Sequence, residues 1–100
     1  MFIAMNRFKI ARGREQEFID LWKARDSYLE DVPGFRKFHL LAGPVTDDYA
    51  LFASHSEWDS RQSFENWTRS EAFRKAHANA GTSKGIYLGP PQVELFDVAL

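Results

Sequence analysis

Hydrophobic periodicity changes along this 100-residue chain in an order that strongly constrains its fold. Residues 2–10 and 35–42 alternate with period two, which is typical of half-buried strands. Between them, from residue 14 to about residue 29, the apolar side chains take helical spacing. We expect further strands at 49–58 and 93–100 and a second helical segment from 60 to about 79. The order β-α-β-β-α-β predicts one ferredoxin-like α+β domain over residues 1–100.

The expected sheet has apolar side chains on both of its faces. Strict alternation over 35–42 places Phe35 with Lys37 on one face and Phe38 on the other. The two helices can cover only one face, and a chain of this length has nothing left to cover the second. Because such a chain buries only about 60–70% of its unfolded surface, self-association would add stability. The sequence therefore predicts a homodimeric α+β barrel in which two sheets face each other.

The second helical segment carries two candidate start signals. Asp59 is a candidate N-cap, with Gln62 three residues later as in a capping box. Ser70 is a second candidate cap, so we expect the helix to bend there. Ten residues of straight helix rotate by about 1000°, which would leave Trp67 and His77 about 80° apart. A bend near Ser70 would direct both side chains into one cavity.

Composition excludes several classes of function. The chain has no cysteine, which excludes disulfides, thiolate catalysis and zinc fingers. A net charge of −1 without a basic stripe argues against nucleic-acid binding. No apolar run reaches about 18 residues and no signal peptide is visible, so we expect no membrane span and a cytoplasmic location. The common nucleotide, metalloprotease, calcium and serine-hydrolase motifs are also missing.

Two residues are candidates because of the surfaces on which they are expected. Asn6 lies between Ala4 and Phe8 on an apolar strand face, where an unsatisfied amide costs about 1–3 kcal/mol. It either bonds a neighbouring strand or loop, or donates into a pocket. Trp67 shares a helix face with Phe64 and either fills the core or forms the wall of a site for a flat ligand.

His77 is the third candidate. Phe73 precedes it by one helical turn, and small residues surround it, which would let a flat ligand approach the helix closely. Neutral imidazole is a common metal ligand and the usual proximal ligand of heme. A lone helical histidine can also be a solvated or capping residue, and the residues alone leave both interpretations open.

Taken together, these residues resemble a known family over nearly the whole chain. The matching segments are Ala4-Met5-Asn6-Arg7-Phe8, Pro33-Gly34-Phe35, and the spacing Trp58-x8-Trp67-x9-His77. The chain resembles the IsdG-type heme-degrading monooxygenases of the antibiotic biosynthesis monooxygenase (ABM) superfamily, which are dimeric α+β barrels. The Pro-Gly-Phe segment and Trp58 are typical of the superfamily, and the combination of Asn, Trp and His is typical of its heme-degrading branch.

The resemblance implies roles for these residues. His77 would be the proximal iron ligand, and Asn6 would donate a hydrogen bond to iron-bound dioxygen or peroxide. Trp67 would press on the porphyrin and ruffle it, with Phe64 and Phe73 as further heme contacts. Heme would be both cofactor and substrate, with O2 and an external electron donor, a separate reductase, completing the reaction. Ring opening would release iron and a bilin product.

One segment departs from the family pattern, and alternative functions stay open. The loop at 81–91 is unlike that of the family and is expected to border the pocket. Lys84 or Arg74 could reach the heme propionates, and the identity of the bilin is left open. The alternatives are a cofactor-free ABM monooxygenase that acts on an aromatic or quinol substrate, a non-catalytic heme-binding protein, and a barrel without catalysis.

Overall fold

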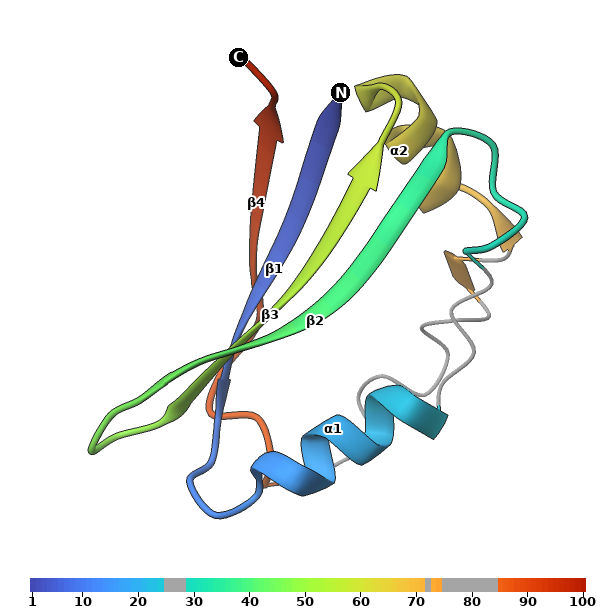
Figure 1. Cartoon of the computed structure of the whole chain (residues 1–100). Helices are drawn as coiled ribbons and strands as arrows, with labels where there is room; N and C mark the ends of the chain where they lie inside the picture. Colours follow the sequence, from blue (N-terminus) through green and yellow to red (C-terminus); the bar gives the residue numbers. More distant parts are fainter. Residues whose placement is uncertain (25–28, 72, 75–84) are drawn as a thin grey trace.

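The computed structural model describes residues 1–24, 29–71, 73–74 and 85–100. Its elements, in chain order, are β1 (Phe2–Ile10), α1 (Glu15–Ala24), β2 (Phe35–Val45), β3 (Ala50–Trp58), α2 (Arg61–Thr68) and β4 (Gln92–Asp97). The helices lie on the same side of one curved sheet (Figure 1). This order and layering confirm the ferredoxin-like α+β fold. Within the described residues, no helix has the length and apolar character needed to cross a bilayer.

The sheet is antiparallel throughout, with the strand order β2-β3-β1-β4. The register pairs Phe2 with Trp58 and Asn6 with Ser54 across β1 and β3. Even-numbered residues of both strands face the helices, and most of them are buried. The period-two alternation of residues 2–10 therefore positions Asn6 on the helix-facing side, near the middle of a central strand.

Two apolar clusters fill the space between the sheet and the helices. One consists of Phe8, Ile10, Phe18, Ala50, Phe52 and Ile86. The other consists of Phe2, Ala4, Leu29, Trp58 and Trp67. On β1 the clusters are separated at Asn6, and on β3 they are separated at its partner Ser54 and at Ser56. These three polar residues therefore lie between two packed cores.

Several boundaries differ from the sequence prediction. The first helix, expected to reach about residue 29, is described as far as Ala24, and Leu29 is buried but not helical. β2 continues to Val45 instead of ending at residue 42, and β4 ends at Asp97 instead of residue 100. A register shift between Phe35 and Lys37 also interrupts the alternation of β2. The extra residue lets Phe35 and Phe38 both pack against the second cluster, which corrects their assignment to opposite faces.

The face of the sheet opposite the helices remains partly apolar. Leu41, opposite Ala53 in the β2–β3 register, and Phe96, opposite Ile3 in the β1–β4 register, both lie on this face. Their side chains are 40% and 47% exposed, respectively. The sequence predicted such an uncovered apolar face, and the homodimer inferred from it stays a prediction.

Candidate active site

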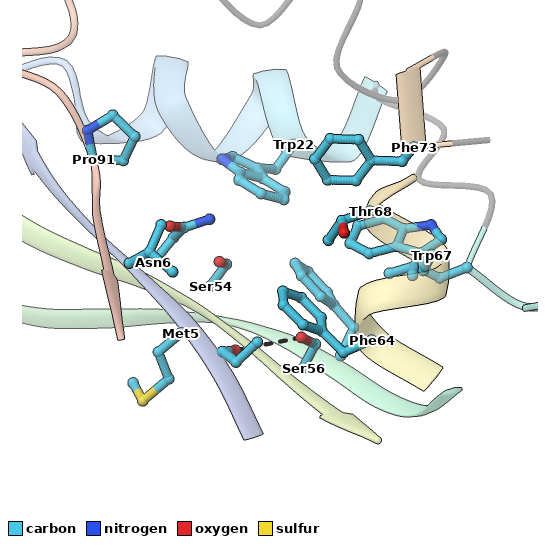
Figure 2. Close-up of a pocket in the computed structure, with 14 residues that line it drawn as sticks. Met5, Asn6, Trp22, Ser54, Ser56, Phe64, Trp67, Thr68, Phe73 and Pro91 are labelled. Atoms are coloured by element: carbon cyan, nitrogen blue, oxygen red, sulfur yellow. Dashed lines mark hydrogen bonds between the residues drawn. The ribbon is translucent and has the colours of Figure 1, made fainter. Parts of the chain in front are cut away.

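A cavity of about 390 Å³ lies between the sheet and the helical layer (Figure 2). Its lining residues are Ala4, Met5, Asn6, Trp22, Leu29, Phe38, Ser54, Ser56, Phe64, Trp67, Thr68, Phe73, Pro91 and Val93. This volume lies within the range of small-molecule sites, and so does the combination of aromatic walls with few polar groups. None of these lining residues is ionisable. The described walls therefore offer packing and hydrogen bonds to a ligand, and no acid or base.

Asn6 is the most unusual group in this cavity. Its Oδ1 is buried and has no hydrogen-bond partner within the described part of the chain. Its amide nitrogen is directed toward the interior of the cavity (Figure 2). β1 is a central strand, paired at Asn6 with Ser54 on one side and Val93 on the other, so the backbone at Asn6 is held rigidly. The sequence left two roles open for Asn6, a hydrogen bond to a neighbouring strand or loop and a hydrogen bond into a pocket. Among the described residues, the first of these is not seen.

Trp67 both fills the core and lines the cavity. The indole is only 9% exposed, and its ring centroid lies 5.4 Å from that of Trp58 and 4.8 Å from that of Phe73. Phe64, one turn earlier on α2, adds a third ring at 6.4 Å. Packing on several sides holds the indole in place. Trp67 is therefore a rigid part of the cavity wall.

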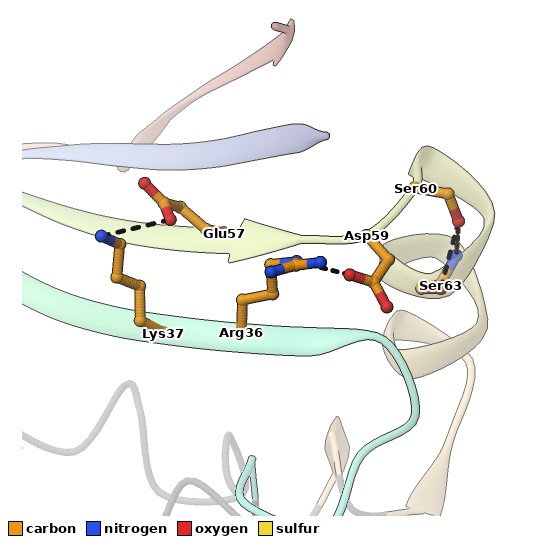
Figure 3. Close-up of polar contacts among 6 residues, drawn as sticks. All are labelled: Arg36, Lys37, Glu57, Asp59, Ser60 and Ser63. Carbon is orange, nitrogen blue, oxygen red and sulfur yellow. Dashed lines mark hydrogen bonds and ion pairs between the residues drawn. The ribbon is translucent and has the colours of Figure 1, made fainter.

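Local capping sets the direction in which α2 leaves the sheet. Ser60 is the N-cap, and its Oγ accepts a hydrogen bond from the backbone N–H of Ser63 at 3.2 Å (Figure 3). The prediction that Asp59 caps the helix with Gln62 is therefore wrong. The carboxylate of Asp59 instead forms an ion pair with Arg36 of β2. This contact between distant segments leaves the cap position to the next residue.

The predicted interruption near Ser70 is confirmed. α2 ends at Thr68, and Ser70 Oγ donates a hydrogen bond to the carbonyl of Trp67 at 2.6 Å. The same hydroxyl accepts a hydrogen bond from the backbone N–H of Phe73 at 3.1 Å and so caps a new helical turn. This change of direction brings Phe73 against Trp67, and both line the cavity.

The structure thus brings four of the five predicted site residues, Asn6, Phe64, Trp67 and Phe73, to one cavity. His77, the predicted iron ligand, lies outside the described residues, as do Lys84 and the segment 81–84 of the long loop. Arg74 is described and forms a surface ion pair with Glu71 at 3.3 Å.

The described end of the long loop packs along the end of β1 near the cavity. The carbonyl of Ile86 accepts a hydrogen bond from the N–H of Ala11 at 2.8 Å, and the N–H of Leu88 donates to the carbonyl of Lys9 at 2.9 Å. Ile86 is buried in the first cluster, and Pro91 reaches the cavity. The prediction that this loop borders the pocket holds for Pro91.

Sequence reasoning missed several lining residues. Trp22 and Phe38 stack on each other with ring centroids 5.5 Å apart, and both line the cavity. Ser54 and Ser56 form the polar part of its floor on β3 (Figure 2). The signal that could have identified the serines is the same as for Asn6, namely polar residues at alternate positions between buried aromatic ones.

Comparison with known proteins agrees with this architecture. The family model described as antibiotic biosynthesis monooxygenase matches residues 1–79. A heme-degrading monooxygenase of Bacillus thuringiensis (strain Al Hakam) is 30% identical over 98 residues, which are 98% of this chain and 90% of the relative.

Solved structures share the fold over the whole chain. The heme-degrader MhuD from Mycobacterium tuberculosis, solved with two hemes bound in its active site, superposes with a TM-score of 0.73 at 26% identity. The match covers 100% of this chain and 97% of MhuD. SnoaB, a cofactor-independent oxygenase from Streptomyces nogalater, superposes with a TM-score of 0.69 over 99% of this chain and 93% of its own, at 18% identity, which shows the fold alone. The chain belongs to the antibiotic biosynthesis monooxygenase family.

Proposed function

We propose that this protein is a heme-degrading monooxygenase that binds heme in the cavity and opens the porphyrin ring with O2 and external electrons. The reaction would release iron and a bilin. One observation carries the proposal: Asn6, whose Oδ1 has no hydrogen-bond partner among the described residues, faces an aromatic cavity in a chain 30% identical to a heme-degrading monooxygenase over nearly its full length. When bound, heme would supply both the redox-active iron and the ring that is oxidised.

The described cavity suits an apolar, flat ligand. Its sides are rings of Trp22, Phe64, Trp67 and Phe73, whose faces and edges can pack against a macrocycle. Three of its polar side chains, Asn6, Ser54 and Ser56, lie on the sheet side, and the fourth, Thr68 of α2, donates its hydroxyl hydrogen bond to the carbonyl of Glu65. A macrocycle in this space would therefore have apolar contacts on most sides and hydrogen-bonding groups near one face.

Trp67 would press on the macrocycle and distort it. Its indole is packed against Trp58 and Phe73, so it cannot easily move away from a bound ring. Phe64 and Phe73 would complete the contact. Since protein interiors deform little, part of the strain of binding would fall on the ligand. A distorted ring is the state that we propose for oxidation.

Asn6 would donate a hydrogen bond from its amide nitrogen to the oxygen species that reacts with the ring. Its position on a central strand holds that donor at a fixed place, as electrostatic preorganisation requires. His77 would ligate the iron through a neutral imidazole nitrogen.

The same proposal includes the partners and the location. A second copy of the chain would cover the apolar face that carries Leu41 and Phe96, giving a homodimer. A separate reductase would deliver the electrons, and the reaction would take place in the cytoplasm.

Binding is tested by titrating the purified protein with hemin and recording the Soret band. We expect a saturable Soret shift at one hemin per chain, which His77→Ala abolishes or alters. His39→Ala is the matched control, because His39 is exposed and pairs with His55 on the face opposite the cavity. A wild-type protein that gives no Soret shift would contradict the proposal and favour the cofactor-free oxygenase.

Turnover is tested by adding ascorbate to the hemin complex in air. The Soret band of the wild-type complex should decay, and it should decay more slowly in Trp67→Phe and Asn6→Ala complexes that still bind hemin. A Soret band that persists after reduction would point to a heme-binding protein without catalysis.

A further inference from the structure

A row of three candidate metal ligands crosses the sheet on the face opposite the cavity. His39 of β2 is the Cα partner of His55 of β3, and His55 is the Cα partner of Met5 of β1. Directly opposed side chains on antiparallel strands have Cβ atoms about 4.5–5.5 Å apart. Two imidazoles and one thioether therefore lie next to each other on three adjacent strands.

The register determines the face on which these side chains lie. Asn6 points into the cavity, so its neighbour Met5 and the partner of Met5, His55, have their side chains on the other face of the sheet. Although Met5 borders the cavity, Figure 2 shows its thioether directed away from Asn6. His39 follows Phe38, which lines the cavity, and so belongs to the same outer face. The row is therefore separate from the cavity proposed for heme.

The two imidazoles are not engaged elsewhere in the described part of the chain. Neither of them takes part in a hydrogen bond or an ion pair there. His39 is exposed and His55 and Met5 are half-buried, so an ion can reach the row from solvent. Imidazole nitrogen binds several transition metals, whereas thioether sulfur favours soft ions such as Cu+. A set of two imidazoles and one thioether thus points to copper.

The charged side chains beside the row are paired with each other. Lys37 and Glu57, the next partners along β2 and β3, form an ion pair at 3.5 Å (Figure 3). Arg7 of β1 forms an ion pair with Glu94 of β4. Each of these two cations is balanced by a carboxylate, which limits its repulsion of a bound metal ion. The contact between Lys37 and Glu57 also shows that opposed side chains on this face meet across β2 and β3.

We propose that His39, His55 and Met5 bind one copper ion on the outer face of the sheet. The two imidazole nitrogens hold either oxidation state, and the thioether is a soft third ligand that strengthens the binding of Cu+. Among the divalent first-row metals, copper has the highest affinity for such nitrogen ligands. Because all three ligands come from one chain, the stoichiometry is one ion per chain, also in a homodimer whose second copy covers this face.

The test uses the purified, hemin-free protein, because the row and the cavity lie on opposite faces of the sheet. The protein is titrated with Cu2+ and its EPR spectrum is recorded, and its Cu+ affinity is then measured without oxygen against a competing chelator. We expect one Cu2+ per chain, with nitrogen ligands in the spectrum. Since two linked ligands bind far more tightly than one, His39→Ala and His55→Ala should each weaken Cu2+ binding by about 100-fold or more.

Two further variants separate the thioether and the remaining histidine. Met5→Leu keeps nearly the same side-chain volume and removes the sulfur. It should weaken Cu+ binding by about tenfold or more, and Cu2+ binding by a smaller factor. His77→Ala is the control and should leave both copper affinities unchanged, because His77 is not part of the row.

The outcomes for copper and for hemin are independent. Wild-type copper affinities in His39→Ala and His55→Ala, or a stoichiometry of one ion per two chains, would overturn the copper site and leave the proposed function standing. An unchanged Cu+ affinity in Met5→Leu would overturn the three-ligand site. A chain that binds copper as expected and gives no hemin Soret shift would support the copper site and overturn the proposed function alone.

Discussion

Replacing Asn6 with leucine should stabilise the ligand-free protein while impairing its proposed function. Leucine has nearly the size of asparagine, and it would continue the apolar surface of Ala4 and Phe8. Asn6 Oδ1 is buried without a partner among the described residues, so Asn6→Leu removes a desolvation penalty of about 1–3 kcal/mol. Since 1 kcal/mol shifts the Tm of a domain of this size by about 4–8 °C, the increase should be easy to measure.

Ser56→Ala is the matched change on the same face, and its effect should have the opposite sign. It removes the acceptor of the buried Trp58 indole N–H, along with the bond to the carbonyl of Ala4. We expect a loss of about 1–3 kcal/mol. Urea denaturation at one protein concentration measures both variants on one scale. If Asn6→Leu is less stable than the wild type, then Asn6 is satisfied in the native protein and the interpretation of its amide as a ligand-binding group fails.

Four further predictions concern the capping residues, a turn, the cavity wall and a surface pair. Ser60→Ala should cost about 1 kcal/mol in urea denaturation, whereas Asp59→Ala should cost less, because Ser60 is the cap. Gly34→Ala should lower the free energy of unfolding by more than about 1–2 kcal/mol, because φ is +83° and the added Cβ would lie 2.2 Å from Ser63 Oγ. Gly89→Ala is the control, because a Cβ there would meet nothing within 4 Å. Trp67→Phe places a smaller ring in the cavity wall, so a bound macrocycle should be less distorted. The Soret band of the hemin complex should then change accordingly and decay more slowly with ascorbate. The hydrogen bond from Arg14 lowers the pKa of Glu17 in the folded protein. The small stabilisation from this pair is therefore present above the pKa that Glu17 has in the unfolded chain, and it is lost as the pH falls through the pKa of the folded state. Glu17→Gln should remove that part of the pH dependence of the melting temperature.

Periodicity was enough to predict most of the fold. The alternation of residues 2–10 gave β1 and placed Asn6 on the buried face, because a strand has a strict period of two. The break at Ser70 was also predictable, since a hydroxyl at a helix start and the 80° rotation argument both point to it. Local chemistry decides these features, so a single sequence carries them.

Features that depend on contacts between distant segments were missed. Asp59 and Ser60 are both good cap residues, and the ion pair of Asp59 with Arg36 leaves the cap position to Ser60. The bulge at Phe35 adds a residue that no periodic pattern marks, and it turns Phe35 and Phe38 to the same side.

Only part of the site was predicted, because the rest of it also depends on contacts between distant segments. Asn6 was found because an amide is conspicuous among apolar neighbours, whereas Ser54 attracts attention only once the register places it opposite Asn6. Trp22 and Phe38 resemble ordinary core residues in the sequence, and only the folded chain shows that their stacked rings line the cavity.

Opening of the porphyrin ring changes the mass of the pigment, so mass spectrometry of the product tests the proposed activity of the chain. The hemin complex is reacted with ascorbate in air, the pigment is extracted, and its mass is compared with that of hemin treated in the same way without protein. We expect a linear tetrapyrrole in the protein sample, together with iron that an added chelator captures. Recovery of intact protoporphyrin with its iron still bound, from a complex that shows a normal Soret shift, would contradict the proposed ring opening.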